Sequence, residues 1–138
     1  MIVTVTINPS VDRTIQLPSP LVRDAVLRAS AVSSQAAGKG VNVSRALAHA
    51  SVATRAIVRA DYHDPYVREL VESGLAVVTV DPGASVRTNI SLVEPDGTTT
   101  KINEPGSPLS AAAVAALHDV VAAEAPRASW VVLAGSLP

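Results

Sequence analysis

A lysine between two glycines is the segment of this sequence best suited to bind an anion. Lys39 lies between Gly38 and Gly40, and from residue 41 to residue 50 apolar residues recur at helical spacing, so a helix should begin beside the glycines. The lysine and the free N–H groups at the helix start could together hold a phosphate. The alternative is a tight turn with a solvated lysine. The spacing matches neither a Walker A motif nor GxGxxG, which disfavours nucleotide binding by those routes.

Three further charged residues lie in segments that could face one ligand. Asp12 follows Asn8 by four residues in a turn-rich segment. Its carboxylate could accept hydrogen bonds from two sugar hydroxyls, or it could simply pair with the neighbouring Arg13. Arg87 and Lys101 lie at the outer ends of two strand-like segments, so a hairpin folded over a cleft could bring both cations to one phosphate. The alternative is that they protect strand edges from aggregation.

The elements that must position these side chains alternate between strand and helix. Runs of β-branched residues predict buried strands, and helical spacing with capping residues predicts helices. This order favours a parallel sheet with covering helices and a ligand at the carboxyl ends of its strands. In chain order, the predicted elements are the strand Ile2–Ile7, a helix over 41–50, the strand Thr54–Val58, the helix Pro65–Glu72 with Asp64 as N-cap, and the strand Leu75–Val80.

A hairpin interrupts this alternation. Its strands, Thr88–Val93 and Thr98–Ile102, flank the turn sequence Glu-Pro-Asp-Gly. The earlier segment Val11–Leu17 is interpreted as an edge or lid strand. We therefore expect a partial α/β core made of residues 1–10, 29–85 and 104–138, and a β lid made of residues 11–28 and 86–103. The last predicted elements are a helix from Ser110 to Ala125 and the strand Trp130–Leu133.

Composition narrows the classes of function. The 138 residues are 48% hydrophobic, enough for one domain with a packed core. Eleven basic and twelve acidic side chains give a net charge of -1, so there is no broad field to attract nucleic acid or a membrane. The absence of cysteine and of a signal peptide suits a cytoplasmic protein. No metal-ligand spacing links the three histidines, His49, His63 and His118.

Five motifs, in order over essentially the whole chain, resemble the amino-terminal half of the ribokinase-like, PfkB-type carbohydrate kinases, and within them the 1-phosphofructokinases. They occupy residues 8–14 (NPSVDRT), 38–47 (GKGVNVSRAL), 87–90 (RTNI), 94–106 (EPDGTTTKINEPG) and 133–138 (LAGSLP). The resemblance implies an α/β fold, a three-layer sandwich in which helices cover both faces of a parallel sheet, with a small β-sheet lid.

The same resemblance implies an activity and a substrate site. The intact enzyme would phosphorylate a sugar phosphate with ATP, converting fructose 1-phosphate to fructose 1,6-bisphosphate. Tagatose 6-phosphate and fructose 6-phosphate are the alternative substrates. The implied site has Asp12 gripping sugar hydroxyls, Gly38 and Asn42 lining the sugar pocket, Lys39, Arg87 and Lys101 holding the existing phosphate, and Ser136 facing the same cleft.

Two motifs of the family do not occur in the sequence. They are the Asn-x-x-Glu segment associated with Mg²⁺ and the Gly-Ala-Gly-Asp motif, which supplies the general base and the anion hole. We therefore expect a truncated chain that supplies the sugar-phosphate-binding half, with no catalytic or metal-binding residue of its own and no activity alone. ATP and Mg²⁺ would bind in the intact enzyme. The alternative is a non-catalytic sugar-phosphate-binding module, or a dimerisation module that forms a homodimer through the lid.

Overall fold

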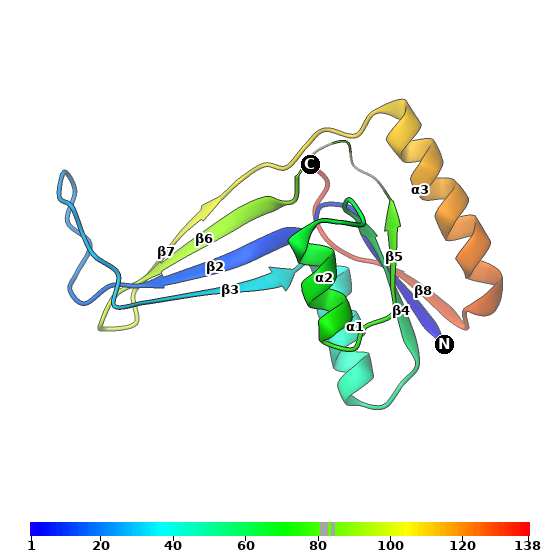
Figure 1. Ribbon diagram of the computed structural model, residues 1–138, viewed down its shortest axis with the longest axis horizontal. Helices are drawn as coiled ribbons and strands as arrows, with labels where there is room; N and C mark the ends of the chain where they lie inside the picture. The colour runs from blue at the N-terminus through cyan, green and yellow to red at the C-terminus, as the bar shows by residue number, and fades with distance from the viewer. Residues whose placement is uncertain (81–82, 84) are drawn as a thin grey trace.

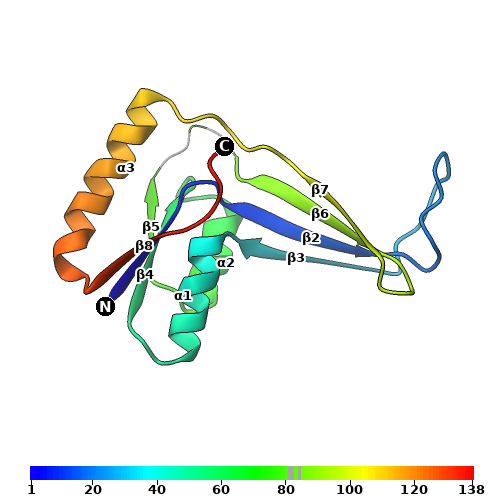
Figure 2. The same ribbon diagram turned by 180° about the vertical axis from the view of Figure 1, so that it is seen from behind.

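A helix-covered parallel sheet and a second sheet that projects away from it make up the computed structural model (Figure 1). The structure describes residues 1–80, 83 and 85–138. Seen from behind, the second sheet still extends to one side, and the carboxyl terminus lies near its base (Figure 2). Within the described residues, every helix is too short or too polar to cross a lipid bilayer.

The core sheet has four parallel strands in the order β5-β4-β1-β8. The chain first adds strands on one side of β1 and then returns to add β8 on the other side. The strand order therefore reverses between β1 and β8, and this is the place where open α/β sheets bind ligands. The bounds are β1 Ile2–Thr6, β4 Thr54–Arg59, β5 Val77–Val80 and β8 Trp130–Leu133.

Helices cover both faces of this sheet, so the three-layer prediction is confirmed. On one face, Val41 of α1 and Leu70 of α2 pack in a cluster with Val58 of β4. On the other face, Val5 of β1 packs in a second cluster with Leu117 of α3. The helices are α1 Lys39–His49, α2 Pro65–Glu72 and α3 Ala111–Glu124, the last followed by the short 3-10 helix η1 Ala125–Arg127.

The second sheet contains the predicted hairpin. Its strand order is β3-β2-β6-β7. The hairpin strands β6 and β7 are antiparallel, as expected, while β2 runs parallel to β6 and antiparallel to β3. The bounds are β2 Ser10–Gln16, β3 Ala31–Ala37, β6 Arg87–Val93 and β7 Thr99–Asn103.

Strand β3 was not predicted, and residues 29–37 had been assigned to the core. The structure instead pairs β3 with β2 along its whole length. Its sequence, AVSSQAA, contains a single β-branched residue, so local preference gives no strand signal. The strand exists because β2 presents an open edge to it, and such a partner is visible only in the tertiary structure.

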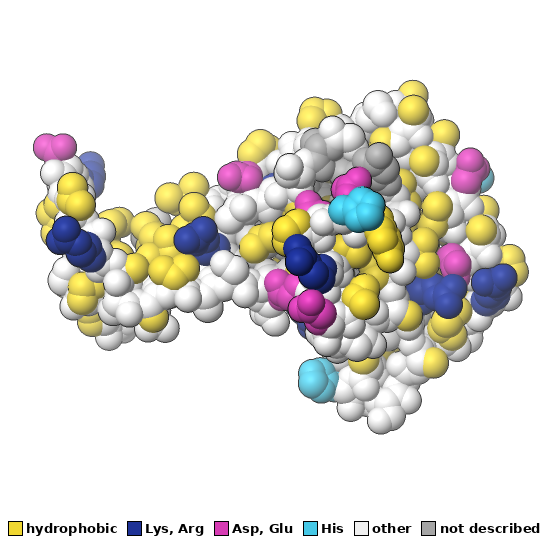
Figure 3. Space-filling model, viewed as in Figure 1, with side chains coloured by type: hydrophobic (Ala, Val, Ile, Leu, Met, Phe, Trp, Pro, Cys, Tyr) yellow, Lys and Arg dark blue, Asp and Glu magenta, His cyan; other side chains and the backbone are white. Residues whose placement is uncertain are grey.

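The two faces of the second sheet differ in chemistry. Side chains alternate along each strand, and paired residues share a face. One face, here called the polar face, carries Asp12, Thr14, Gln35, Ser33, Asn89, Ser91, Lys101 and Asn103. The opposite face, called the apolar face, carries Val11, Ile15, Val32, Ile90, Leu92 and Ile102, interspersed with Arg13, Ser34, Thr88 and Thr100. Hydrophobic side chains gather on the projecting sheet in Figure 3.

Candidate functional site

A pocket opens where β1 and β8 end and the second sheet begins. Its volume is about 400 Å³, within the usual range for small-molecule sites. The reversal of strand order between β1 and β8 places this pocket where ligands of open α/β sheets bind. We call it the strand-end pocket, and it is lined by Asn8, Ser10, Asp12, Gly38, Lys39, Asn42, Arg87, Asn89, Asn103, Gly135 and Ser136.

The start of α1 forms one wall of the strand-end pocket. The helix begins at Lys39, directly after Gly38, which has a φ of 139°. Because the residue at the N-cap is a glycine, no side chain there caps the N–H groups of the first turn. Gly40 packs against β1, and the backbone N–H of Val41 donates to Thr6 Oγ1 at 3.0 Å. The exposed ammonium of Lys39 and the positive end of the helix dipole therefore act on the same space.

Asp12 projects from β2 into the same pocket. Its Oδ1 accepts hydrogen bonds from Ser10 Oγ at 2.9 Å and from Asn89 Nδ2 at 3.0 Å. Both of these bonds use one carboxylate oxygen, so Oδ2 can accept from a ligand hydroxyl. Arg13 lies on the opposite face of the strand, so the alternative in which Asp12 simply pairs with its neighbour does not apply.

One arginine lines the pocket from the second sheet, and another, from the core sheet, lies beside it. Arg87 lines the pocket and donates through Nη1 to the carbonyl of Glu104 at 2.6 Å. Arg59, at the end of β4, is only 4% exposed and lines a small cavity beside the pocket together with Arg87. Burial lowers the pKa of Arg59. Its guanidinium donates to the carbonyls of Ser107 and Pro108, which fixes the connection toward α3.

Lys101 lies outside the strand-end pocket. It lies on the polar face, as Asn103 does. However, Lys101 pairs with Ser91, two residues farther from the core than the pair formed by Asn89 and Asn103. Paired positions on one face repeat every second residue, a step of about 7 Å along the strand. The other six residues expected from the sequence, Asp12, Gly38, Lys39, Asn42, Arg87 and Ser136, all line the pocket.

Sequence reasoning assigned no role to five other residues of the pocket, which are Asn8, Ser10, Asn89, Asn103 and Gly135. Asn8 Nδ2 donates to the carbonyl of Pro105 at 3.0 Å and to Ser136 Oγ at 3.4 Å, so it links three segments. Asn89 and Asn103 face each other across β6 and β7, beside Asp12. Each alternates with apolar residues in the sequence, which indicates that the two asparagines lie on the polar face of their strands. That they lie beside Asp12 depends on the strand register, which the sequence does not give.

Two other open hollows are somewhat larger but offer weaker chemistry. One, of about 480 Å³, lies between α1, α2 and β3, where Arg45 and Glu69 face each other. The other, of about 570 Å³, lies over α2 beside Tyr62 and Val71. The strand-end pocket instead combines two cations, a helix N-terminus and several amides, so it is the candidate site.

The described part of the chain has no group of three or more His, Cys, Asp or Glu side chains that could hold a metal ion. In the strand-end pocket, Asp12 is the single carboxylate, beside two cations. A divalent cation needs several oxygen ligands at close range, so these residues do not fit one. The pocket suits an anionic ligand.

Similarity to known proteins covers the whole chain. No protein-family model matches it. A 1-phosphofructokinase of Rhodobacter capsulatus is 36% identical over 143 residues, which cover 99% of this chain and 44% of that protein. A 1-phosphofructokinase of Xanthomonas campestris pv. campestris is 37% identical over 139 residues, covering 99% of this chain and 43% of that protein. The chain is a homologue of the 1-phosphofructokinases. It spans less than half the length of these relatives.

Solved structures agree with the sequence relationship. Phosphofructokinase-2 from Escherichia coli in complex with fructose-6-phosphate is 27% identical, with a TM-score of 0.86, over 99% of this chain and 46% of that one. A tetrameric inhibited form of the same enzyme has a TM-score of 0.87, at 28% identity, over 99% of this chain and 45% of that one. The PfkB-type, ribokinase-like fold expected from the five motifs is therefore confirmed.

Proposed function

We propose that the chain supplies the sugar-phosphate-binding side of an ATP-dependent carbohydrate kinase, which in the intact enzyme converts fructose 1-phosphate to fructose 1,6-bisphosphate. The observation that carries the proposal is the convergence of Asp12, Lys39 and Arg87 on one pocket from three separate segments. Similarity to 1-phosphofructokinases over the whole chain supports fructose 1-phosphate as the substrate.

The chemistry of the strand-end pocket divides between the two parts of such a substrate. Lys39, Arg87 and the N-terminus of α1 supply positive charge and N–H donors for a phosphate. Asp12 and the side-chain amides of Asn42 and Asn103 offer acceptors and donors for sugar hydroxyls. Together these groups would hold the acceptor sugar in a fixed orientation, which is a large part of catalysis in phosphoryl transfer.

The phosphoryl donor in this proposal is ATP with Mg²⁺, bound in the intact enzyme. The described residues form no site for the metal, so no step is assigned to a metal held by this chain. Residues 1–138 therefore act on the acceptor side, by binding and orienting the sugar phosphate. We expect the chain alone to form no ADP.

The apolar face favours a second role, as a dimerisation surface for another copy of the chain. Val32 is 49% exposed and Ile102 is 55% exposed on this face. The second sheet extends away from the core, so its outer part gains no cover from the helices (Figure 1). Exposed apolar surface of this kind marks interaction sites, and closed symmetric dimers are the commonest assemblies.

Calorimetric titration of the purified chain with fructose 1-phosphate tests the binding proposal directly. We expect saturable binding, and weaker binding of inorganic phosphate and of fructose, because each offers half of the contacts. Fructose 6-phosphate and tagatose 6-phosphate titrated in parallel rank the substrates. A kinase assay with ATP then separates binding from catalysis. Failure of a folded chain to bind any of the three sugar phosphates would overturn the proposal.

The two lysines of the site prediction provide a matched comparison. Lys39→Met removes a cation from the pocket, whereas Lys101→Met removes one from the polar face of the second sheet, outside the pocket. A hydrogen bond to a charged group contributes about 1.5–3 kcal/mol, so Lys39→Met should weaken binding of fructose 1-phosphate about tenfold to a hundredfold. Lys101→Met should change it less than about threefold. Equal effects of the two substitutions would contradict the assigned pocket.

A further inference from the structure

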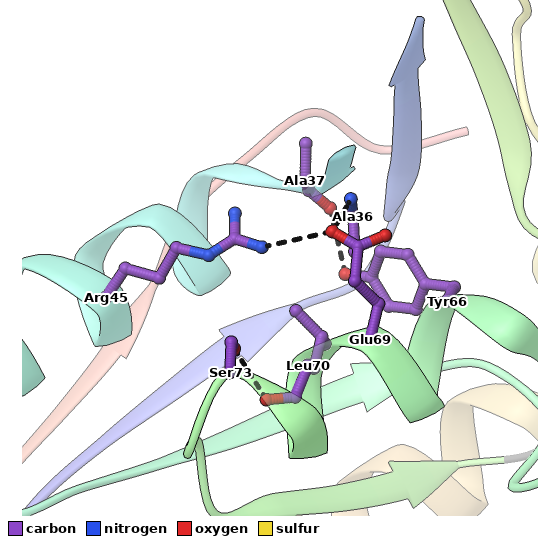
Figure 4. Close-up of polar contacts among 7 residues, drawn as sticks. All are labelled: Ala36, Ala37, Arg45, Tyr66, Glu69, Leu70 and Ser73. Atoms are coloured by element: carbon purple, nitrogen blue, oxygen red, sulfur yellow. Dashed lines mark hydrogen bonds and ion pairs between the residues drawn. The ribbon is translucent and has the colours of Figure 1, made fainter. Parts of the chain in front are cut away.

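Helix α2 lines no part of the strand-end pocket among the described residues, yet it contacts the segment that leads into the pocket. That segment is the end of β3, where Ala36 and Ala37 precede Gly38. Strand β3 is at the edge of the second sheet, so its outer side has no neighbouring strand. Side chains of α2 supply hydrogen-bond partners there instead (Figure 4).

Tyr66 holds the carbonyl group of Ala37. Its hydroxyl donates to Ala37 O at 2.8 Å, and the residue is 1% exposed. The ring belongs to the core cluster that also contains Val41 and Leu70, so the hydroxyl group is anchored on a rigid support. Burial raises the pKa of Tyr66, so the hydroxyl keeps its donor proton at all working pH values.

Glu69 binds the backbone N–H of Ala36, the residue that precedes Ala37 in the strand. Its Oε1 accepts a hydrogen bond from the backbone N–H of Ala36 at 2.8 Å and lies 3.8 Å from Nη2 of Arg45. Arg45 belongs to α1, so one carboxylate connects the edge strand with both helices on this face. Figure 4 shows Glu69 between Arg45 and the end of the strand.

The chain between Ala37 and Gly40 is therefore held from two sides. On the α2 side are the bonds from Tyr66 and Glu69. On the β1 side, Thr6 packs against Gly38 and accepts a hydrogen bond from the N–H of Val41. The position of Lys39 and of the helix start that faces the pocket depends on both supports.

We propose that Tyr66 and Glu69 are positioning residues for the Gly38–Gly40 turn and, through it, for binding of the substrate's phosphate. The role in binding the phosphate rests on the proposed function, whereas the role in positioning the turn does not. Neither side chain needs to touch the substrate. Each acts through the backbone that carries Lys39.

The first test is Tyr66→Phe, which removes only the hydroxyl group. Tyr62→Phe is its control, because Tyr62 is exposed and makes its ring contact with His63. Tyr66→Phe leaves the buried carbonyl of Ala37 without this partner, and part of the loss should appear as weaker binding of fructose 1-phosphate, by about three- to tenfold. The amide NMR signals of Gly38 and Gly40 should shift in Tyr66→Phe and stay in place in Tyr62→Phe.

The second test uses rescue at Glu69. Glu69→Ala removes the acceptor of the Ala36 N–H and should weaken binding to a similar degree. Glu69→Gln keeps an oxygen that can accept this bond, so binding should stay within about twofold of the unchanged chain. Glu72→Ala is the control for loss of an acidic side chain from α2, because Glu72 is exposed on the last turn.

Binding and NMR together separate the two claims. All measurements are made below the melting temperature of the weakest variant, so that loss of folded protein does not imitate loss of affinity. If the unchanged chain binds no sugar phosphate, the proposed function fails, while the glycine amide signals still test the positioning. If Tyr66→Phe and Glu69→Ala leave both the affinity and the Gly38 and Gly40 signals unchanged, the positioning role is wrong.

Discussion

At the scale of single residues, Gly40 shows how closely the start of α1 must approach β1. A Cβ atom at this position would lie 2.5 Å from Thr6 Oγ1 and 2.7 Å from the carbonyl oxygen of Val5. Strand β1 is hydrogen-bonded on both sides, so it cannot shift to make room. Gly40→Ala should therefore destabilise the fold by about 1–3 kcal/mol, measured by urea denaturation.

Gly74→Ala is the control for this prediction. Gly74 has a φ of 84°, but nothing lies within 4 Å of the position that its Cβ would take. Alanine there should cost about 1 kcal/mol from backbone conformation alone. Because Gly40 helps to place the helix start at the pocket, Gly40→Ala should also weaken ligand binding, whereas Gly74→Ala should not. A smaller loss for Gly40→Ala than for Gly74→Ala would contradict the steric argument.

At the scale of elements, α2 depends on its cap because it has only eight residues. A helix of this length is unstable alone in water. Asp64 accepts a hydrogen bond from the N–H of Tyr66 at 2.8 Å, and Pro65 occupies the first turn, as the sequence predicted. Asp64→Ala should lower the free energy of unfolding by about 1 kcal/mol. Denaturant unfolding followed by circular dichroism measures the change.

Asp64→Ser distinguishes the loss of the cap from the loss of a charge. Serine can accept the same hydrogen bond, so this variant should stay within about 0.5 kcal/mol of the unchanged chain. If serine is as destabilising as alanine, capping is not what Asp64 contributes.

Elements also differed in how far the sequence could predict them. The strands near Val5 and Ile57 are buried and rich in β-branched residues, and α2 carries both its cap and its proline, so local signals were sufficient. Strand β3 has small and polar residues and exists through its pairing with β2. Its absence from the prediction also hid the contacts of α2 with Ala36 and Ala37.

At the scale of the whole molecule, the second sheet presents a polar face toward the ligand side and an apolar face on the other. We expect a second copy of the chain to cover the apolar face. Val32→Lys places a charge on that face, and Ser33→Lys places the same charge on the polar face one residue later. Burying an unpaired charge is costly, so Val32→Lys should weaken self-association at least about tenfold, while Ser33→Lys should have little effect.

Sedimentation analysis over a range of concentrations measures this difference. A chain that stays monomeric at all concentrations would contradict the proposed dimer. If Ser33→Lys, and not Val32→Lys, disrupts self-association, the copies meet through the polar face instead.

The sequence by itself determined the alternation of buried strands and capped helices, the inserted hairpin and the glycine-flanked lysine, because each follows from interactions between near neighbours along the chain. It also named six residues that line the strand-end pocket. Only the tertiary structure decided that Asn89 lies beside Asp12, that Lys101 lies beyond the pocket, and that Asn8 links Pro105 to Ser136. These facts depend on strand register and on contacts between segments about 100 residues apart, and no local pattern encodes either.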